Sequence, residues 1–338
     1  MAMTAREVIE AAIHFGTPDR LPTGDDTCSV RTNHNAGGHR PRGGEQEDYH
    51  SREVYDDFGC LWQRSEVHNM GQVKGHPLQD WDALKTYRWP DPDDPFYYQG
   101  MEERFAGSEG KYVMTSIGLT LWERLWMLRG MEQVLIELHT DPARPAYLAD
   151  RIVEYDLAII HNIGQRFPGR IHGVQLTDDW GTQEATFISP RLWCEFFQPR
   201  YARIFEAAHA QGWDTWIHSD GKINEIVQPW IDAGLDVINM PAPRMVGIEE
   251  VGQRFAGKIC FSNGVDNQAT LPFAGPDEIR AEVQLLLKLW ATPQGGFIGP
   301  GYGTITSRGG EGLAMYGLPL QSVLVMLKAF HEYDPYRQ

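Results

Sequence analysis

The stretch TWIHSDGKI, residues 215–223, places groups capable of acid–base and metal chemistry where an apolar run stops. His218 and Asp220 are two residues apart, so both side chains point to one face if a strand continues through them. An imidazole beside a carboxylate can be a base with its orienting group, half of a metal site, or a clamp for a polar substrate. The same residues also fit a structural role, in which a strand-end histidine is hydrogen-bonded to a nearby acceptor and an ordinary Asp-Gly turn follows it. Spacing alone leaves these interpretations open.

A second strand-like run, HGVQL, is followed by TDDWGTQ, in which Asp178 and Asp179 are adjacent. Two neighbouring carboxylates repel each other unless they are solvated, hydrogen-bonded or bound to a cation. We therefore predict that one of these aspartates lies in a pocket, with Trp180 as a wall of it. Asp178 is a candidate catalytic group, and Asp179 and Trp180 are candidate substrate contacts.

Further candidates follow later apolar runs. SNGVDNQATL, residues 262–271, presents Asn263 and Asp266, which suit polar substrate recognition or a plain loop equally well. The glycine-rich GPGYGTITSRGG lacks the lysine of a phosphate-binding P-loop, so we interpret it as a strand-end loop with Tyr302 and Arg308 as substrate contacts. Glu123 follows a strand-like run and is within reach of the same place, although a helical Glu-Arg pair is more often surface charge.

The elements that must position these residues alternate between strand and helix from about residue 111 onward. Such alternation requires parallel strands with crossover helices. Counting RLPTG, residues 20–24, and GCLWQ, residues 59–63, gives about eight strands, which predicts a (β/α)₈ TIM barrel. A doubly wound open sheet is the alternative, but no G-x-G-x-x-G turn follows the first strand. In a barrel the carboxyl ends of the strands form one mouth.

We predict a single domain, residues 1–338, with residues 25–100 as a lid or hairpin excursion that covers the barrel mouth. This segment begins with a polar, glycine-rich stretch too long for a passive connector. It continues with aromatic and polar residues interrupted by glycine and proline, a pattern that indicates a hairpin.

Composition excludes several classes of function. The chain has 338 residues with 46 acidic against 30 basic side chains, a formal net charge of −16, which argues against non-specific binding to nucleic acid or anionic membrane. No apolar run approaches the ~20 residues that span a bilayer, so we expect a cytoplasmic protein. The four cysteines are scattered without a C-x-x-C pair, which predicts reduced thiols.

The segments DDWGTQ, ISPRLWCEFFQPRYARIFEAAHAQG, HSDG and GVDNQATLPFAGPDEIRAEV carry a resemblance to the uroporphyrinogen decarboxylase superfamily, in the branch with corrinoid-dependent methyltransferases. The similarity extends over almost the whole chain. It implies a (β/α)₈ barrel with the substrate pocket at the carboxyl ends of the strands. Its members are either cofactor-free decarboxylases of a tetrapyrrole or zinc-binding methyltransferases that exchange a methyl group with cobalamin on a partner protein.

The chain departs from both patterns. The decarboxylase run Met-Arg-Gln-Ala-Gly-Arg is absent, and DDTCSVRTNHNAGGHRPRGG stands in its place, which disfavours tetrapyrrole decarboxylation. Thiol methyltransferases of the superfamily hold zinc with His-x-Cys and a later Cys. Here His218 is retained, Asp220 stands at the first Cys and Tyr302 near the second. The resemblance then implies a harder site, with His218, Asp220 and Glu123 as ligands for zinc or another divalent metal.

The leading prediction is a methyltransferase that moves a methyl group from a small substrate, such as a methoxylated aromatic compound, to a corrinoid cofactor on a partner protein. His218, Asp220 and Asp178 are its predicted catalytic residues, and O-demethylation is its predicted chemistry. The alternative is a cofactor-free decarboxylase or lyase for a carboxylated substrate, with Asp178 or Asp220 as proton donor. Its anion clamps would be Arg31, Arg40, Arg42 or Arg308. A barrel that only binds a small molecule or partner is the third possibility; the substrate, the metal and the oligomeric state stay open.

Overall fold

The computed structural model describes residues 2–34, 53–64, 71–302 and 318–337. Its main sheet has seven parallel strands whose order in space follows the order along the chain. They are β1 (Thr27–Ser29), β5 (Tyr112–Leu119), β6 (Gly173–Thr177), β7 (Asp214–His218), β8 (Val237–Asn239), β9 (Cys260–Ser262) and β10 (Phe297–Ile298). A parallel bridge between Thr23 and Gly299 joins the segment before β1 to the residue after β10. The sheet is therefore curled, and its two outer strands are linked through these flanking residues.

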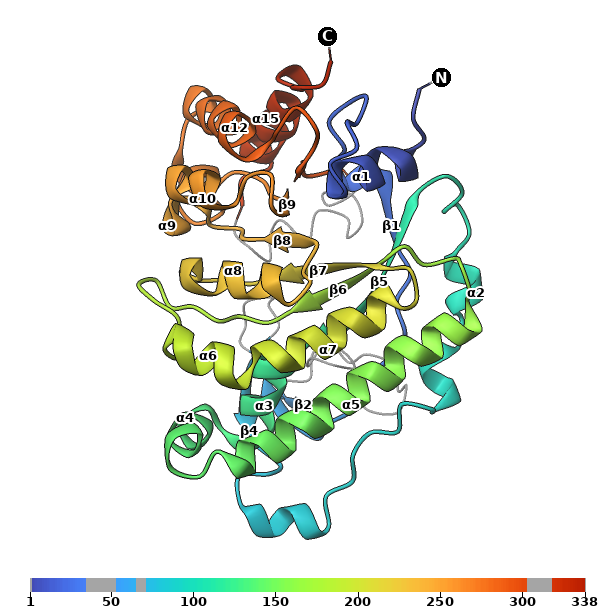
Figure 1. Ribbon diagram of the computed structural model, residues 1–338, viewed down its shortest axis with the longest axis vertical. Coiled ribbons are helices and arrows are strands. Elements are labelled where there is room, and N and C mark those ends of the chain that lie inside the picture. Colours follow the sequence, from blue (N-terminus) through green and yellow to red (C-terminus); the bar gives the residue numbers. More distant parts are fainter. Residues whose placement is uncertain (1, 35–52, 65–70, 303–317, 338) are drawn as a thin grey trace.

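Helices connect the strands and surround the curled sheet (Figure 1). They are α1 (Ala5–Ile13), α2 (Met101–Arg104), α3 (Leu121–Arg129), α4 (Met131–Thr140), α5 (Ala143–Arg166), α6 (Pro190–Phe196), α7 (Gln198–His209), α8 (Asn224–Asp232), α9 (Pro243–Val246), α10 (Ile248–Phe255), α11 (Thr270–Phe273), α12 (Pro276–Trp290) and α15 (Leu320–Glu332). None of the helices within the described residues has the length and apolar character needed to cross a membrane.

The core is divided by the sheet into an outer and an inner apolar cluster. The larger, outer cluster lies between the strands and the helices and includes Ile217 of β7. The inner cluster joins residues of five strands, among them Trp216 of β7, to Ile9 and Ile13 of α1. Because side chains alternate along a strand, His218 lies on the same inner face as Trp216. Helix α1 thus packs at one end of this face, and His218 lies toward the other end.

The expected eight strands are not all found where the sequence placed them. RLPTG contributes only the bridge at Thr23, and the regular strand begins later, at Thr27. GCLWQ was wrong as a barrel strand, because Leu61–Gln63 is β3, the middle strand of a separate antiparallel sheet with β2 (Glu53–Tyr55) and β4 (Gln72–Gly75). Only Trp62 of β3 is buried. This pattern is typical of an antiparallel strand with one solvent-exposed face, whereas strands of a parallel sheet are covered on both faces.

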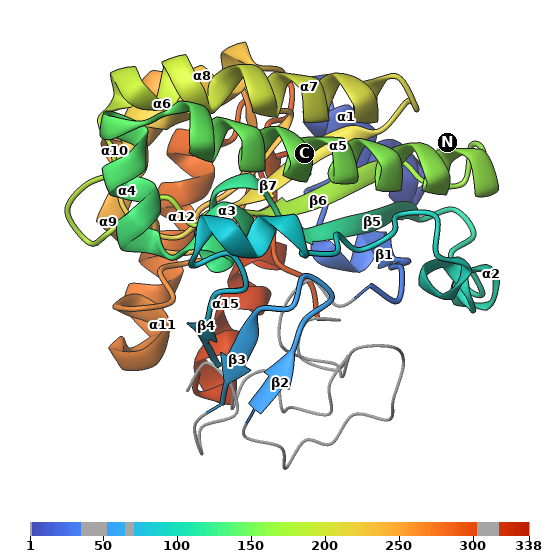
Figure 2. The ribbon, with the colours of Figure 1, turned by 90° about the horizontal axis from the view of Figure 1, so that it is seen from below.

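The fold is therefore α/β with a curled parallel sheet, consistent with a TIM-like barrel, and a full eight-stranded ring stays a prediction. Figure 2 shows the antiparallel β2–β4 sheet on the side of the parallel sheet opposite α7 and α8. This small sheet falls within the segment predicted as a hairpin excursion. All four cysteines are unpaired, as expected.

A buried ion pair ties the antiparallel sheet to α3. Arg124 Nη1 lies 2.7 Å from Asp56 Oδ2, and the two side chains are 1% and 0% exposed. Asp56 also accepts hydrogen bonds from Cys60 N at 2.9 Å and Trp62 Nε1 at 3.1 Å. The Arg124 guanidinium stacks over the ring of Phe58, 4.1 Å from its centroid. The turn between β2 and β3 is thus fixed to the helix that follows β5.

Replacing Arg124 by Ala is expected to lower the free energy of unfolding by about 3–5 kcal/mol, because the Asp56 carboxylate would stay buried without its counter-charge. Urea unfolding followed by circular dichroism measures this change. The control is Arg191→Ala, which removes a fully solvent-exposed ion pair with Glu195 and should leave the midpoint nearly unchanged. Equal midpoints for both variants would show that this ion pair does not hold the small sheet in place.

Two histidines pair with aspartates near the amino ends of the strands. His14 Nε2 lies 3.1 Å from Asp214 Oδ1, and His209 Nε2 lies 2.7 Å from Asp236 Oδ2. The hydrogen bond to Asp214 raises the pKa of His14, and the hydrogen bond to Asp236 raises the pKa of His209. A raised histidine pKa stabilises the fold below the unfolded-state value of about 6.5, and that gain is lost as the pH rises through the folded-state value.

We therefore expect wild type to be more stable than His209→Gln at about pH 6, with a difference that shrinks steadily toward about pH 9. Urea unfolding of both proteins across this range measures the difference. Because both histidines are partly exposed, added salt should reduce it as well. A difference that grows with pH would have the wrong sign for this pairing.

Candidate functional site

Three ionisable side chains converge beyond the carboxyl ends of β6 and β7. Asp179 follows β6, His218 ends β7, and Asp220 lies two residues further on. His218 Nε2 is 3.9 Å from Asp179 Oδ1 and 3.7 Å from Asp220 Oδ2. One ligand atom from each residue lies within 4.8 Å of the other two. We call Asp179, His218 and Asp220 the triad; it is the one such group of three among the described residues.

A close backbone contact between two loops brings the two aspartates together. Gly181 N donates to Asp220 O at 3.2 Å, and Asp220 N donates to Asp179 Oδ1 at 2.8 Å. A Cβ on Gly221 would lie 2.2 Å from the carbonyl carbon of Gly181, and Gly221 has φ +91°. Since both the contact distance and this φ exclude other side chains, the glycines allow the loops after β6 and β7 to touch.

Asn239, the last residue of β8, fixes the orientation of His218. Asn239 Oδ1 lies 2.6 Å from His218 Nδ1, while Asn239 Nδ2 donates to the carbonyl of Ser262 on β9. Because the amide nitrogen already has an acceptor, the oxygen must face the ring, so we assign the proton to Nδ1. His218 Nε2 is then the nitrogen that faces the two carboxylates.

The electrostatics of the triad favour a positive charge between the aspartates. Burial lowers the pKa of His218, but Asp220 and Asp179 outweigh it and raise this pKa to about 9. Burial and the nearby Asp220 raise the pKa of Asp179, against the opposing effect of His218. Oxygen and imidazole ligands also suit a divalent cation. The triad can therefore hold either the histidine's second proton or a metal ion.

Asp178 is fully buried and holds the amino end of α3. Its carboxylate accepts hydrogen bonds from Trp122 N at 2.8 Å, from Glu123 N at 2.7 Å and from the hydroxyl of Tyr201. Burial raises the pKa of Asp178 to about 7 even though these three donors oppose the rise. The structure thus gives Asp178 a positioning role for Glu123, and its predicted catalytic role stays a prediction.

Glu123 lies next to Asp179. The backbone of Asp179 donates a hydrogen bond to its carboxylate, and burial followed by the charges of Asp179 and Asp178 raises its pKa well above the usual range. Its Oε2 is buried and has no hydrogen-bond partner among the described residues. Glu123 therefore lies beside the triad with a raised carboxyl pKa, and it is not one of the three converging members.

The remaining predicted substrate contacts lie elsewhere or have other contacts. Trp180 is fully buried in the outer core, where it stacks on Trp122 and donates to Tyr201. Asn263 is buried, and its amide exchanges hydrogen bonds with the backbone of Met240. The structure therefore brings neither side chain to the triad.

Asp266 accepts hydrogen bonds from the backbone nitrogens of Arg244, Gln268 and Ala269, so it shapes its own loop. Tyr302 is 48% exposed, and its backbone nitrogen donates to Asp25. The predicted anion contacts Arg40, Arg42 and Arg308 lie outside the described residues. Among the predicted substrate contacts, only Asp179 belongs to the triad.

Comparison with known proteins gives the class of protein. Residues 124–333 match the family model described as Uroporphyrinogen decarboxylase (URO-D), which is more than half of the chain. The chain therefore belongs to the uroporphyrinogen decarboxylase family, which confirms the resemblance found in the sequence. None of the curated proteins compared with it matches.

A methyltransferase from Methanosarcina mazei has a similar fold over 98% of this chain and 99% of its own, with a TM-score of 0.65 and 15% sequence identity. A D-psicose 3-epimerase from Clostridium cellulolyticum H10 is more distant, with a TM-score of 0.41 and 13% identity over 75% of this chain and 86% of its own. The first similarity supports the arrangement of the fold, and the second is too loose to add to it.

Asn239→Ala is expected to weaken binding of a divalent cation about 10–100-fold, because His218 would lose the partner that orients its ring. Isothermal titration of the metal-free protein with zinc measures the affinity. Asn162→Ala is the matched control, since its amide bonds to Pro92 and Asp93 instead. If the two variants bind zinc equally well, Asn239 does not position the triad.

Proposed function

We propose that this protein is a methyltransferase whose triad binds a divalent cation and whose substrate is a small methylated molecule, such as a methoxylated aromatic compound. The methyl acceptor in this proposal is a corrinoid carried by a partner protein. The observation that carries the proposal is the convergence of one imidazole nitrogen and two carboxylate oxygens beyond adjacent parallel strands. Family membership and the similarity to a methyltransferase fold support the choice of reaction.

The residues present fit a divalent cation. Asp179, His218 and Asp220 would be its ligands, and Asp220 Oδ1 is buried without a hydrogen-bond partner among the described residues. The set lacks the thiolates that favour soft chemistry, so it suits zinc or a harder divalent ion. When bound, such an ion would supply Lewis-acid polarisation of a substrate oxygen. Glu123, predicted as a ligand, would hold the backbone of Asp179 instead.

The protein's own residues would handle the proton that the reaction requires. When the bond between the methyl carbon and the substrate oxygen breaks, the methyl group passes to the acceptor and the oxygen must gain a proton or a counter-charge. With the cation bound, His218 Nε2 would be a ligand and the cation would supply the counter-charge; without it, the same nitrogen carries a proton between the two carboxylates. Burial raises the pKa of Glu123, which lies beside Asp179. Asn239 keeps the imidazole in place while the proton moves.

The resemblance to the methyltransferase branch is the sole basis for the corrinoid and its partner, and we assign no residue to them. The small β2–β4 sheet supports the predicted excursion within residues 25–100, and its action as a lid over the mouth belongs to this proposal. A single domain and a cytoplasmic location complete it.

One observation favours the decarboxylase or lyase alternative. Arg31 Nη2 donates to Oε1 of Gln175, 3.3 Å away, and Gln175 shares the inner face of β6 with Thr177. An arginine over this face is suited to hold a substrate carboxylate. That reaction would need no divalent cation, so metal dependence separates the two functions.

His218→Ala is expected to lower the bound divalent metal from roughly one ion per chain to near zero, because it removes the single nitrogen ligand. Elemental analysis of the purified proteins measures the content, with exposed His139→Ala as control. Methyl transfer from a methoxylated benzoate to cob(I)alamin should fall at least about a hundredfold in the same variant. Unchanged metal content rules out the ligand assignment, and metal-independent release of carbon dioxide would favour the alternative.

A further inference from the structure

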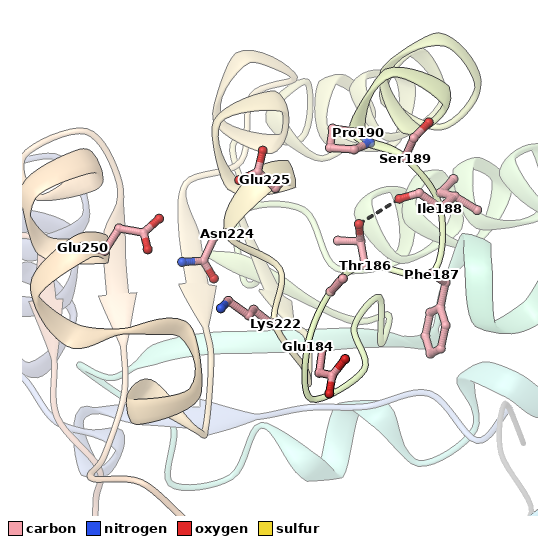
Figure 3. Close-up of a pocket in the computed structure, with 11 residues that line it drawn as sticks. Glu184, Thr186, Phe187, Ile188, Ser189, Pro190, Lys222, Asn224, Glu225 and Glu250 are labelled. Atoms are coloured by element: carbon pink, nitrogen blue, oxygen red, sulfur yellow. Dashed lines mark hydrogen bonds between the residues drawn. The ribbon is translucent and has the colours of Figure 1, made fainter.

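A cavity of about 540 Å³ lies next to the amino end of α8, the helix that follows the loop carrying Asp220 (Figure 3). It is lined by residues 184–190 of the loop after β6 and by side chains near the amino ends of α8 and α10. None of the three triad residues is part of this lining. The backbone contact between Gly181 and Gly221 precedes both lining segments, so it separates the cavity from Asp179 and Asp220 along each loop.

Asn224 gives this cavity an unsatisfied acceptor. The side chain is 4% exposed, and its Nδ2 donates to the carbonyl of Val246 at 2.6 Å. Its Oδ1 is buried and has no hydrogen-bond partner among the described residues. Figure 3 shows the amide nitrogen turned toward the side of Glu250 and the oxygen turned away from it. A buried acceptor without a donor lowers the stability of the fold, so Oδ1 is suited to accept a hydrogen bond from a ligand.

The charges of the lining also favour a donor. Glu184 and Glu225 line the cavity, and neither has an ion-pair partner in the part of the chain that the structure describes. Glu250 is already paired with Arg254, at 2.7 Å. Lys222 contributes the one cationic side chain of the lining. The acceptors therefore outnumber the donors around this space.

We propose that the cavity binds a small protonated primary amine, a ligand class independent of the methyl-transfer proposal. An ammonium group has three N–H donors and no acceptor, so it can satisfy Asn224 Oδ1 and a lining carboxylate together. Ile188 and Pro190 line the same space and suit a short alkyl chain. Glu225 also stabilises the first turn of α8, but that role leaves the buried amide oxygen without a donor.

Calorimetric titration of the full chain with butylammonium chloride tests the proposal, with 1-butanol as the uncharged probe of similar size. Butylammonium is expected to bind saturably and 1-butanol is not. Glu225→Gln should weaken butylammonium about tenfold, the loss of one charge-assisted hydrogen bond. Glu195→Gln, the same change at an exposed glutamate outside the cavity, should leave the affinity unchanged.

Two further variants make the result decisive. His218→Ala should bind butylammonium as wild type does. Loss of the metal site can therefore be distinguished from loss of amine binding. Lys222→Met should bind it more tightly, because one competing ammonium is removed. Binding by Lys222→Met but not by wild type would overturn the proposal, since Lys222 would then be the donor itself. Equal binding of butylammonium and 1-butanol, or no effect of Glu225→Gln, would overturn it as well.

Discussion

The contact between the backbones of Gly181 and Gly221 is the constraint on which the site depends. It holds the loops after β6 and β7 so close that Asp220 N bonds to Asp179 Oδ1, and the two carboxylates then face the same imidazole nitrogen. The same contact separates the triad from the neighbouring cavity. Any side chain at either glycine would meet backbone atoms rather than a movable side-chain end. Backbone contact therefore holds these two adjacent loops together.

Helix α3 links this site to the small antiparallel sheet. Asp178, which follows β6, accepts hydrogen bonds from backbone nitrogens in the first turn of α3. Two consecutive side chains of this helix then contact different parts of the molecule. Glu123 lies beside Asp179, whereas Arg124 reaches Asp56 in the small sheet. Neighbouring residues of one helical turn therefore contact both the small sheet and Asp179 of the triad.

Local patterns predicted those features that depend on strand geometry alone. The apolar run ending at His218 predicted a strand that ends near this residue, and the alternation of elements predicted the parallel sheet; the structure confirms both. The adjacent aspartates could not be assigned from the sequence, because the choice depends on which one meets the amino end of α3. That partner is Asp178, which leaves Asp179 for the triad. Their roles differ through tertiary contacts that spacing does not encode.

Other sequence patterns were also insufficient, because tertiary contacts decide where their residues lie. GCLWQ has the composition of a buried strand, but the turn at Asp56 and its bond to Arg124 direct it into a separate sheet. Trp180 follows the aspartates, yet its ring stacks on Trp122 in the outer core and its indole N–H donates to the Tyr201 hydroxyl. Asn239 does carry a signal, since it is a polar residue that ends the apolar run DVI, directly beside β7.

Two neighbouring groups, Glu123 and His218, have raised pKa values for different physical reasons. Burial raises the pKa of Glu123, while Asp220 and Asp179 raise the pKa of His218 to about 9, so both shifts favour the protonated forms. Pairs of groups whose environments shift their protonation in this way are typical of acid–base sites. A divalent cation at the triad would displace the proton on His218 Nε2, since the same lone pair must bind either one. Metal and proton are therefore competing occupants of the triad, and Glu123, whose pKa is raised by burial, lies outside this competition.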